Sequence, residues 1–137
     1  MNQNMNQNTK FDQLLIDNNP IEIVVKMFVQ IAHMFNVESG NSYTEIKERV
    51  VNYMFLKHVN ALPPEEQIAT LEYVTENGND KRELIVLSSP AMIPTYLKSV
   101  ALETKVFILG EGVDHYLAYQ TVFQYAVDFQ NSYESLA

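Results

Sequence analysis

The stretch NPIEIVVKMFVQIAHMFN, residues 19–36, decides the fold class. Asn19 is a good N-cap because its side chain can accept hydrogen bonds from the first turn, and Pro20 suits the first helical position. If the stretch is helical, spacings of four, four and three residues align its polar side chains in one narrow stripe, formed by Glu22, Lys26, Gln30 and His33. The rest of the circumference is apolar. The sequence therefore predicts a helix that is buried on most sides.

Two more helices are predicted by clear start and stop signals. Ser42 and Glu45 form a possible capping box, which opens a helix over residues 43–60. Pro64 opens a third helix, and Gly78 ends it, because glycine is common just beyond a helix C-terminus. The first three long segments of the chain are thus all predicted to be helical.

The region that follows residue 80 can be read in two ways. Residues 84–88 and 105–109 lie in short apolar runs, which periodicity alone cannot assign to strand or helix. They are either buried strands, or parts of a short helix capped by Asp80 and of a long helix that ends near residue 109. Two isolated parallel strands would make a poor sheet, and the sequence offers no third strand. We favour the helical alternative and leave the strand alternative open.

The segment from residue 113 to about 136 is the longest periodic one. Its apolar side chains form a broad arc, and polar side chains line the opposite side. Gly110 is predicted to end the preceding helix, Gly112 to permit the chain reversal, and Asp114 to cap the last helix. The sequence therefore predicts an all-α bundle of five to six helices that ends in a long antiparallel pair.

Length and composition indicate one globular domain. The 137 residues are 47% hydrophobic, and we expect residues 11–137 to form a single domain behind a disordered polar leader at 1–10. The net charge is -8, and the nine basic residues are scattered, so we expect no nucleic-acid partner. The sequence has no cysteine, no secretory leader and no run of apolar residues long enough for a membrane span, which together favour a cytoplasmic protein.

Catalytic and metal-binding motifs are not evident in the sequence. The three histidines lack the spacing of a helical zinc site, and no cysteine can complete one. Residues 110–112 read GEG, which lacks the lysine and serine or threonine of a phosphate loop. Four glutamates at 65, 66, 72 and 76 are best interpreted as a solvated face of the third helix. We expect neither an enzyme nor a metal centre.

The layout resembles a known family. The buried helix at 20–36, the middle helices at 43–60 and 64–77, and the pair of helices around residues 110–112 resemble the haem-less globin sensor domains of bacilli. That family includes the amino-terminal domain of the stressosome sensor and plasmid-encoded sporulation-inhibitory sensor-domain proteins. The resemblance implies a globin-like bundle, a homodimer and an apolar tunnel that takes a fatty acid. It also implies competition with a sensor histidine kinase for its signal, and thereby inhibition of sporulation.

Two functional hypotheses follow. In the first, the chain is a non-catalytic sensor that holds a fatty acid between the buried early helix and the last two helices. Haem is not expected, because residues 64–77 contain no histidine that could serve as its proximal ligand. Candidate ligand-binding residues are Val24, Phe28, Ile31, Phe35, Met54, Phe55, Tyr116, Tyr119 and Phe123, with His58 and His115 as polar groups. In the second, the chain is an acidic interaction module or inhibitor without a small-molecule ligand, and its additional apolar surface is a protein interface.

Overall fold

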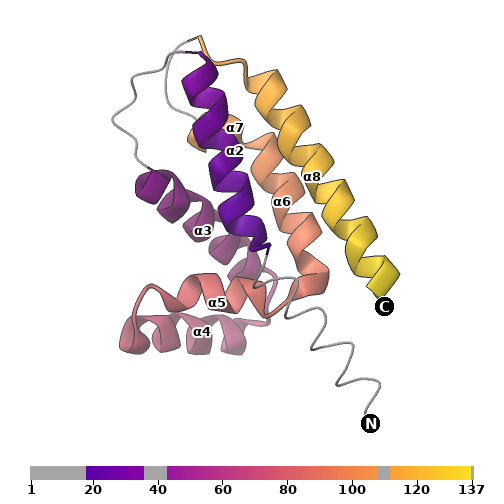
Figure 1. Ribbon diagram of the computed structural model, residues 1–137. Coiled ribbons are helices and arrows are strands. Elements are labelled where there is room, and N and C mark those ends of the chain that lie inside the picture. Colours follow the sequence, from indigo (N-terminus) through magenta and orange to yellow (C-terminus); the bar gives the residue numbers. More distant parts are fainter. Residues whose placement is uncertain (1–17, 36–42, 108–111, 137) are drawn as a thin grey trace.

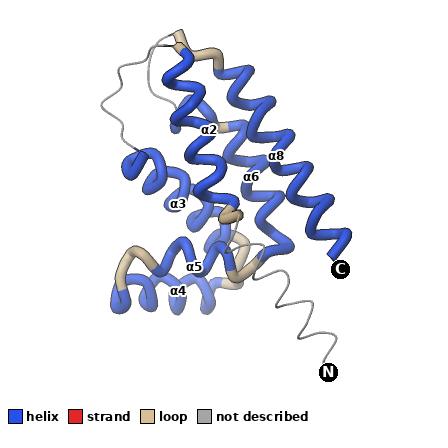
Figure 2. The backbone as a smooth tube through the Cα atoms, viewed as in Figure 1, coloured by secondary structure: helices blue, strands red, loops and turns tan. Residues whose placement is uncertain are grey.

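The structure is a computed structural model that describes residues 18–35, 43–107 and 112–136. Within these residues the chain is helical and contains no strand (Figure 2), so the prediction of an all-α chain is confirmed. In chain order the elements are α2 (Pro20–Met34), α3 (Tyr43–Asn60), α4 (Pro64–Asn77), α5 (Lys81–Leu87), the 3-10 helix η1 (Pro90–Met92), α6 (Ile93–Leu102), α7 (Thr104–Phe107) and α8 (His115–Leu136). The predicted leader at 1–10 lies outside the described residues.

The helices form a bundle with a hairpin across one end. Figure 1 shows α6 and α8 running antiparallel, and α8 packs against both α6 and α2. The α3 helix packs against α2, α5 and α6, so it joins the bundle to the hairpin formed by α4 and α5. The α4 helix lies at the outer edge of this arrangement (Figure 1), where α3 and α5 are its main neighbours.

The α2 helix begins where its sequence predicts. The Asn19 Oδ1 atom accepts hydrogen bonds from the backbone N–H groups of Ile21 and Glu22, at 3.0 and 3.4 Å. Its apolar side is buried as expected, with Ile21, Val24, Val25, Phe28 and Ile31 in the core. The helix ends at Met34, two residues before the predicted end at residue 36. The predicted bounds of α3 and α4 agree with the structure, while the predicted capping residue Ser42 lies outside the described residues.

The region after residue 80 is helical where it is described. The α5 and α7 helices cover residues 84–87 and 105–107, so the strand alternative is wrong for these residues, and residues 108–109 are not described. The expected long helix to residue 109 is also wrong, because it breaks at Glu103, whose φ of -109° and ψ of 31° leave the α-helical region. The break turns the chain so that Phe107 enters the core.

The reversal before α8 follows its predicted design in the described part. Gly112 has a φ of +91°, a backbone conformation that glycine adopts without a steric penalty. Asp114 Oδ1 accepts hydrogen bonds from the N–H groups of Tyr116 and Leu117 at 3.0 and 3.1 Å, which confirms it as the cap of α8. Gly110 lies outside the described residues.

Among the described residues, no single helix has both the length and the apolar composition needed to cross a membrane. In the described part of the chain, one pair of helices, Lys81–Leu87 and Pro90–Leu102, satisfies both criteria when taken together, with a bend of 81° between its two parts.

Candidate functional site

The predicted apolar ligand-binding residues on α2 and α3 lie in the packed core. Val24, Phe28, Ile31, Met54 and Phe55 all belong to one buried cluster. The Phe28 ring stacks on Phe107 with a centroid distance of 5.7 Å, and Tyr53 meets Phe107 edge to face at 5.4 Å. Their apolar surface is thus used in packing between helices. A side chain of this kind stabilises the fold whether or not a ligand is also bound.

The predicted aromatic residues at the end of α2 and on α8 are more exposed than these core residues. Phe35 is the C-cap of α2 and is exposed, as is Tyr116 in the first turn of α8, although a residue that lines an internal tunnel is expected to face the interior. Tyr119 and Phe123 are half-buried. The three aromatic rings on α8 follow one another along the helix surface. The distance between ring centroids is 6.3 Å from Tyr116 to Tyr119 and 5.5 Å from Tyr119 to Phe123.

His58 makes a specific polar contact that its sequence position did not reveal. Its Nδ1 atom lies 3.1 Å from the Tyr96 hydroxyl, within hydrogen-bond distance, and the two rings meet edge to face. Burial lowers the pKa of His58 and raises the pKa of Tyr96, because both charged forms lose hydration. The neutral imidazole is therefore the favoured form at neutral pH. The pair links the last turn of α3 to α6.

His115 begins α8 and is half-buried. Its Nδ1 atom is buried and makes no hydrogen bond within the described part of the chain, while its backbone carbonyl accepts a 3.5 Å hydrogen bond from the Thr104 hydroxyl. His58 and His115 belong to different contacts on different helices. The structure therefore does not show them together in one polar site.

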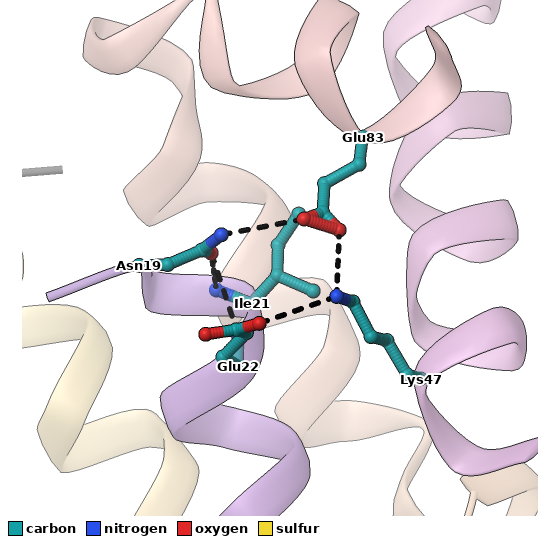
Figure 3. Close-up of polar contacts among 5 residues, drawn as sticks. All are labelled: Asn19, Ile21, Glu22, Lys47 and Glu83. Atoms are coloured by element: carbon teal, nitrogen blue, oxygen red, sulfur yellow. Dashed lines mark hydrogen bonds and ion pairs between the residues drawn. The ribbon is translucent and has the colours of Figure 1, made fainter. Parts of the chain in front are cut away.

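A charged network joins three helices (Figure 3). Lys47 Nζ on α3 lies 3.3 Å from Glu22 Oε1 on α2 and 3.2 Å from Glu83 Oε2 on α5. The cap residue Asn19 donates from Nδ2 to Glu83 Oε1 at 3.3 Å. Burial alone would lower the pKa of Lys47, but the hydrogen bonds and negative charges of Glu83 and Glu22 outweigh it and raise that pKa. This network links α2, α3 and α5.

A groove of about 460 Å³ lies next to this network between α3 and α5. Acidic and basic side chains alternate in its walls, which are formed by Thr44, Lys47, Glu48, Val51, Asn79, Asp80, Arg82, Glu83 and Leu84. Arg82 is held in place by hydrogen bonds to Asn52 Oδ1 at 2.8 Å and to the Asn79 carbonyl at 3.0 Å. Among the described residues, no group of three His, Cys, Asp or Glu side chains could hold a metal ion. The groove thus presents neither one sign of charge nor a ligand set for a metal.

The α4 helix differs from the others in how little of it is buried. Of its residues, all of which the structure describes, only Val74 is buried. Ile68 is 60% exposed and Leu71 is 45% exposed. A shallow hollow of about 270 Å³ lies along this side, lined by Ile68, Leu71, Glu72, Thr75 and Glu76. We call these five residues, together with Glu65, the α4 face.

The α4 face has a regular order around the helix. Because an α-helix turns about 100° per residue, Ile68, Leu71 and Thr75 form one row, next to the buried side that contains Val74. Glu65, Glu72 and Glu76 form a second row beside the first, farther from the core. The periodicity of this row is present in the sequence, since spacings of three and four residues separate Ile68, Leu71 and Thr75. It is masked by the four glutamates of the same helix, which favour the interpretation as a solvated face.

The comparisons with known proteins returned no relative. No family model, no curated protein and no solved structure matches this chain.

Proposed function

We propose that this chain is a non-catalytic interaction module that binds a different, basic protein through the α4 face. The observation that carries the proposal is the exposure of Ile68 and Leu71 on a helix that buries only Val74 among its residues. This is the second of the two hypotheses that the sequence allows. The exposed apolar row of α4 supports it.

The side chains of Ile68 and Leu71 expose apolar surface whose burial against a partner would be favourable. Burying one Ile or Leu side chain contributes about 1.5–3 kcal/mol. Single apolar side chains are common on protein surfaces and need no explanation. In the α4 face, however, Ile68 and Leu71 stand one turn apart and line the same hollow, so one partner surface can cover both.

Charge favours a partner of a different sequence. Residues 64–77 contain four glutamates and no lysine or arginine, and the whole chain has a net charge of -8. A symmetric dimer through α4 would bring the same acidic rows together, because a two-fold interface pairs a surface with itself. Like charges placed opposite each other disfavour that contact, whereas a basic partner gains from it. We therefore assign the α4 face to a basic protein and not to a second copy.

The first hypothesis, a fatty-acid sensor with a globin-like bundle and no haem, stays a prediction. The homodimer and the link to a sensor histidine kinase that it implies also stay predictions. Five of its proposed wall residues are already packed in the buried core, for example Phe28, whose ring stacks on Phe107. Native mass spectrometry of the purified protein, followed by lipid extraction, tests it directly. A bound mass of fatty-acid size supports the sensor, and a ligand-free protein counts against it.

The interaction module is tested by site-specific photo-crosslinking in the cells that produce the protein. The photoreactive residue p-benzoylphenylalanine replaces Thr75 in the α4 face or, as a control, the exposed Gln120 on α8. We expect one protein to be linked from position 75 and not from position 120. That protein is then purified and must bind the unmodified chain, with at least tenfold weaker binding to the double variant Ile68→Ser/Leu71→Ser. The proposal fails if no partner is linked, or if the double variant binds it equally well.

A further inference from the structure

We infer that the segment which binds the α4 face is a basic amphipathic helix, laid along α4 as in a short two-stranded coiled coil. This inference rests on the proposed function and specifies its partner. It follows from the shape of the face, from the secondary structure around it and from the positions of its charges.

The shape of the face suits helix side chains better than a small molecule. The hollow measures about 270 Å³ and is lined by residues of one helix only, whereas small-molecule sites are concave and usually enclose about 300–1,000 Å³. From Ile68 to Thr75 the row extends over two helical turns, roughly 10 Å. The apolar residues of an amphipathic helix repeat over the same distance, at spacings of three, four and seven.

The other common modes of peptide binding lack their structural requirements here. Addition of a β-strand needs an exposed sheet edge, and the described residues contain no strand. Recognition of a proline-rich segment needs a groove lined by aromatic side chains, whereas this hollow is lined by Ile68, Leu71 and Thr75 with two glutamates. The backbone of α4 is already paired within its own helix, so side chains must provide the contacts. Packing of helix against helix provides them in this way.

The positions of the residues match one strand of a coiled coil. With Ile68 at position a of a heptad, Leu71 falls at d and Thr75 at the next a. Glu65 and Glu72 then both fall at position e, which borders the seam between two helices and selects the partner by charge. The opposite border is position g, where Val74 is buried in the chain's own core. A partner helix therefore meets acidic residues along one side of its seam.

Lysine or arginine beside the seam on the partner helix can pair with the acidic residues Glu65 and Glu72. Of the two other glutamates on α4, Glu76 falls at position b, and Glu66 falls at position f and points away from the seam. It is exposed like Glu72, on the same helix. Glu66→Lys and Glu72→Lys change the net charge equally, and only Glu72→Lys changes the seam. The two variants form a matched pair.

The experiment uses the full chain and three synthetic peptides of 21 residues. The first two have leucine at a and d; the first has lysine at e and g, and the second has glutamate there. The third is a scrambled version of the first, with the same composition but without the heptad pattern. Binding is measured by fluorescence anisotropy, and the contact surface is mapped by amide chemical shifts of the ¹⁵N-labelled chain. Circular dichroism verifies that each variant keeps its helical content.

We expect only the lysine peptide to bind, with shift changes centred on Ile68, Leu71 and Thr75. Glu72→Lys should weaken its binding about tenfold and allow the glutamate peptide to bind, while Glu66→Lys should change neither by more than about twofold. Raising the salt concentration should weaken binding of the lysine peptide, because these charges are at the surface. The inference is overturned if lysine and glutamate peptides bind equally, or if Glu66→Lys weakens binding as much as Glu72→Lys.

Other occupants give different results. Concentration-dependent dimerisation that Leu71→Ser abolishes would assign the face to a second copy. Nuclear Overhauser contacts between residues 11–16 and Leu71 would assign it to the chain's own amino-terminal segment. Either result overturns the inference. A crosslinked partner that binds the α4 face through an acidic or extended segment overturns the helix and its charge, but leaves protein binding through α4 in place.

Discussion

Lys47 and Glu83 form an ion pair of 3.2 Å between α3 and α5. The same ammonium group lies 3.3 Å from Glu22 on α2, so one cation is shared by two carboxylates from different helices. All three side chains are partly shielded from water, and Glu83 also accepts a hydrogen bond from the α2 cap residue Asn19. The contact connects the beginning of the buried helix to the hairpin that carries α4.

Replacing Lys47 by methionine should therefore destabilise the fold. The variant leaves Glu22 and Glu83 without their shared cation, which we expect to lower the free energy of unfolding by about 1–2 kcal/mol, between the values for exposed and for buried ion pairs. Urea denaturation measures the loss. The exposed Lys26 on α2 provides the control, because Lys26→Met removes the same charge outside this network. Equal losses for the two variants would show that the network contributes nothing beyond net charge.

His58 should make the fold less stable in mild acid. Its pKa in the folded chain is lowered by burial, below the ordinary value of 6.5. The unfolded chain then binds a proton more readily than the folded one, so this contribution to stability is fully present above pH 6.5 and is lost as the pH falls below it. NMR titration of the His58 ring should show the lowered pKa directly.

The variant His58→Phe isolates this effect. It keeps an aromatic ring against Tyr96 but cannot take up a proton. Between pH 7.5 and pH 5, we expect the free energy of unfolding to fall more for the unmodified protein than for the variant. Carboxylates contribute the same background to both. An identical fall in the two proteins would contradict the assignment to His58.

Phe107 should be among the most sensitive positions of the core. It is fully buried, stacks on Phe28 and contacts Tyr53. We expect Phe107→Ala to lower the free energy of unfolding by about 3–5 kcal/mol, because it removes a large side chain and leaves a cavity. The preceding residue, Val106, is 51% exposed, and Val106→Ala should change stability by less than about 0.5 kcal/mol. Thermal denaturation of the two variants distinguishes these effects. Similar losses of stability in both variants would contradict an α7 helix that buries Phe107 and exposes Val106.

Local signals explain why much of the fold was predictable. Asn19, Pro20 and Asp114 act within one or two turns of their own positions, so caps and helix starts could be derived from a few neighbouring residues. The break at Glu103 could not be derived in this way. The residues on both sides of it are compatible with a continuous helix, and the change of direction is set by the packing of Phe107 against α2 and α3.

The candidate site was less predictable for a related reason. Periodicity identifies an apolar side of a helix, but it does not say whether that side faces the core. On α4 the neighbouring helices cover Val74 and leave Ile68 and Leu71 exposed, and this depends on where α3 and α5 lie. The contacts between His58 and Tyr96 and between Lys47 and Glu83 join residues far apart in the chain, so they also required the structure.

The α4 face should be dispensable for folding. Ile68 and Leu71 are largely exposed, so we expect Ile68→Ser/Leu71→Ser to change the free energy of unfolding by less than about 1 kcal/mol, since each surface substitution contributes within about 0.5 kcal/mol. Val74→Ala, three residues after Leu71, should lower the free energy of unfolding by about 1.6 kcal/mol or more, because it removes two buried methyl groups. Urea denaturation of the isolated protein compares the two variants. If the double serine variant loses as much stability as Val74→Ala, the exposed row belongs to the core of the fold and is not free to bind a partner.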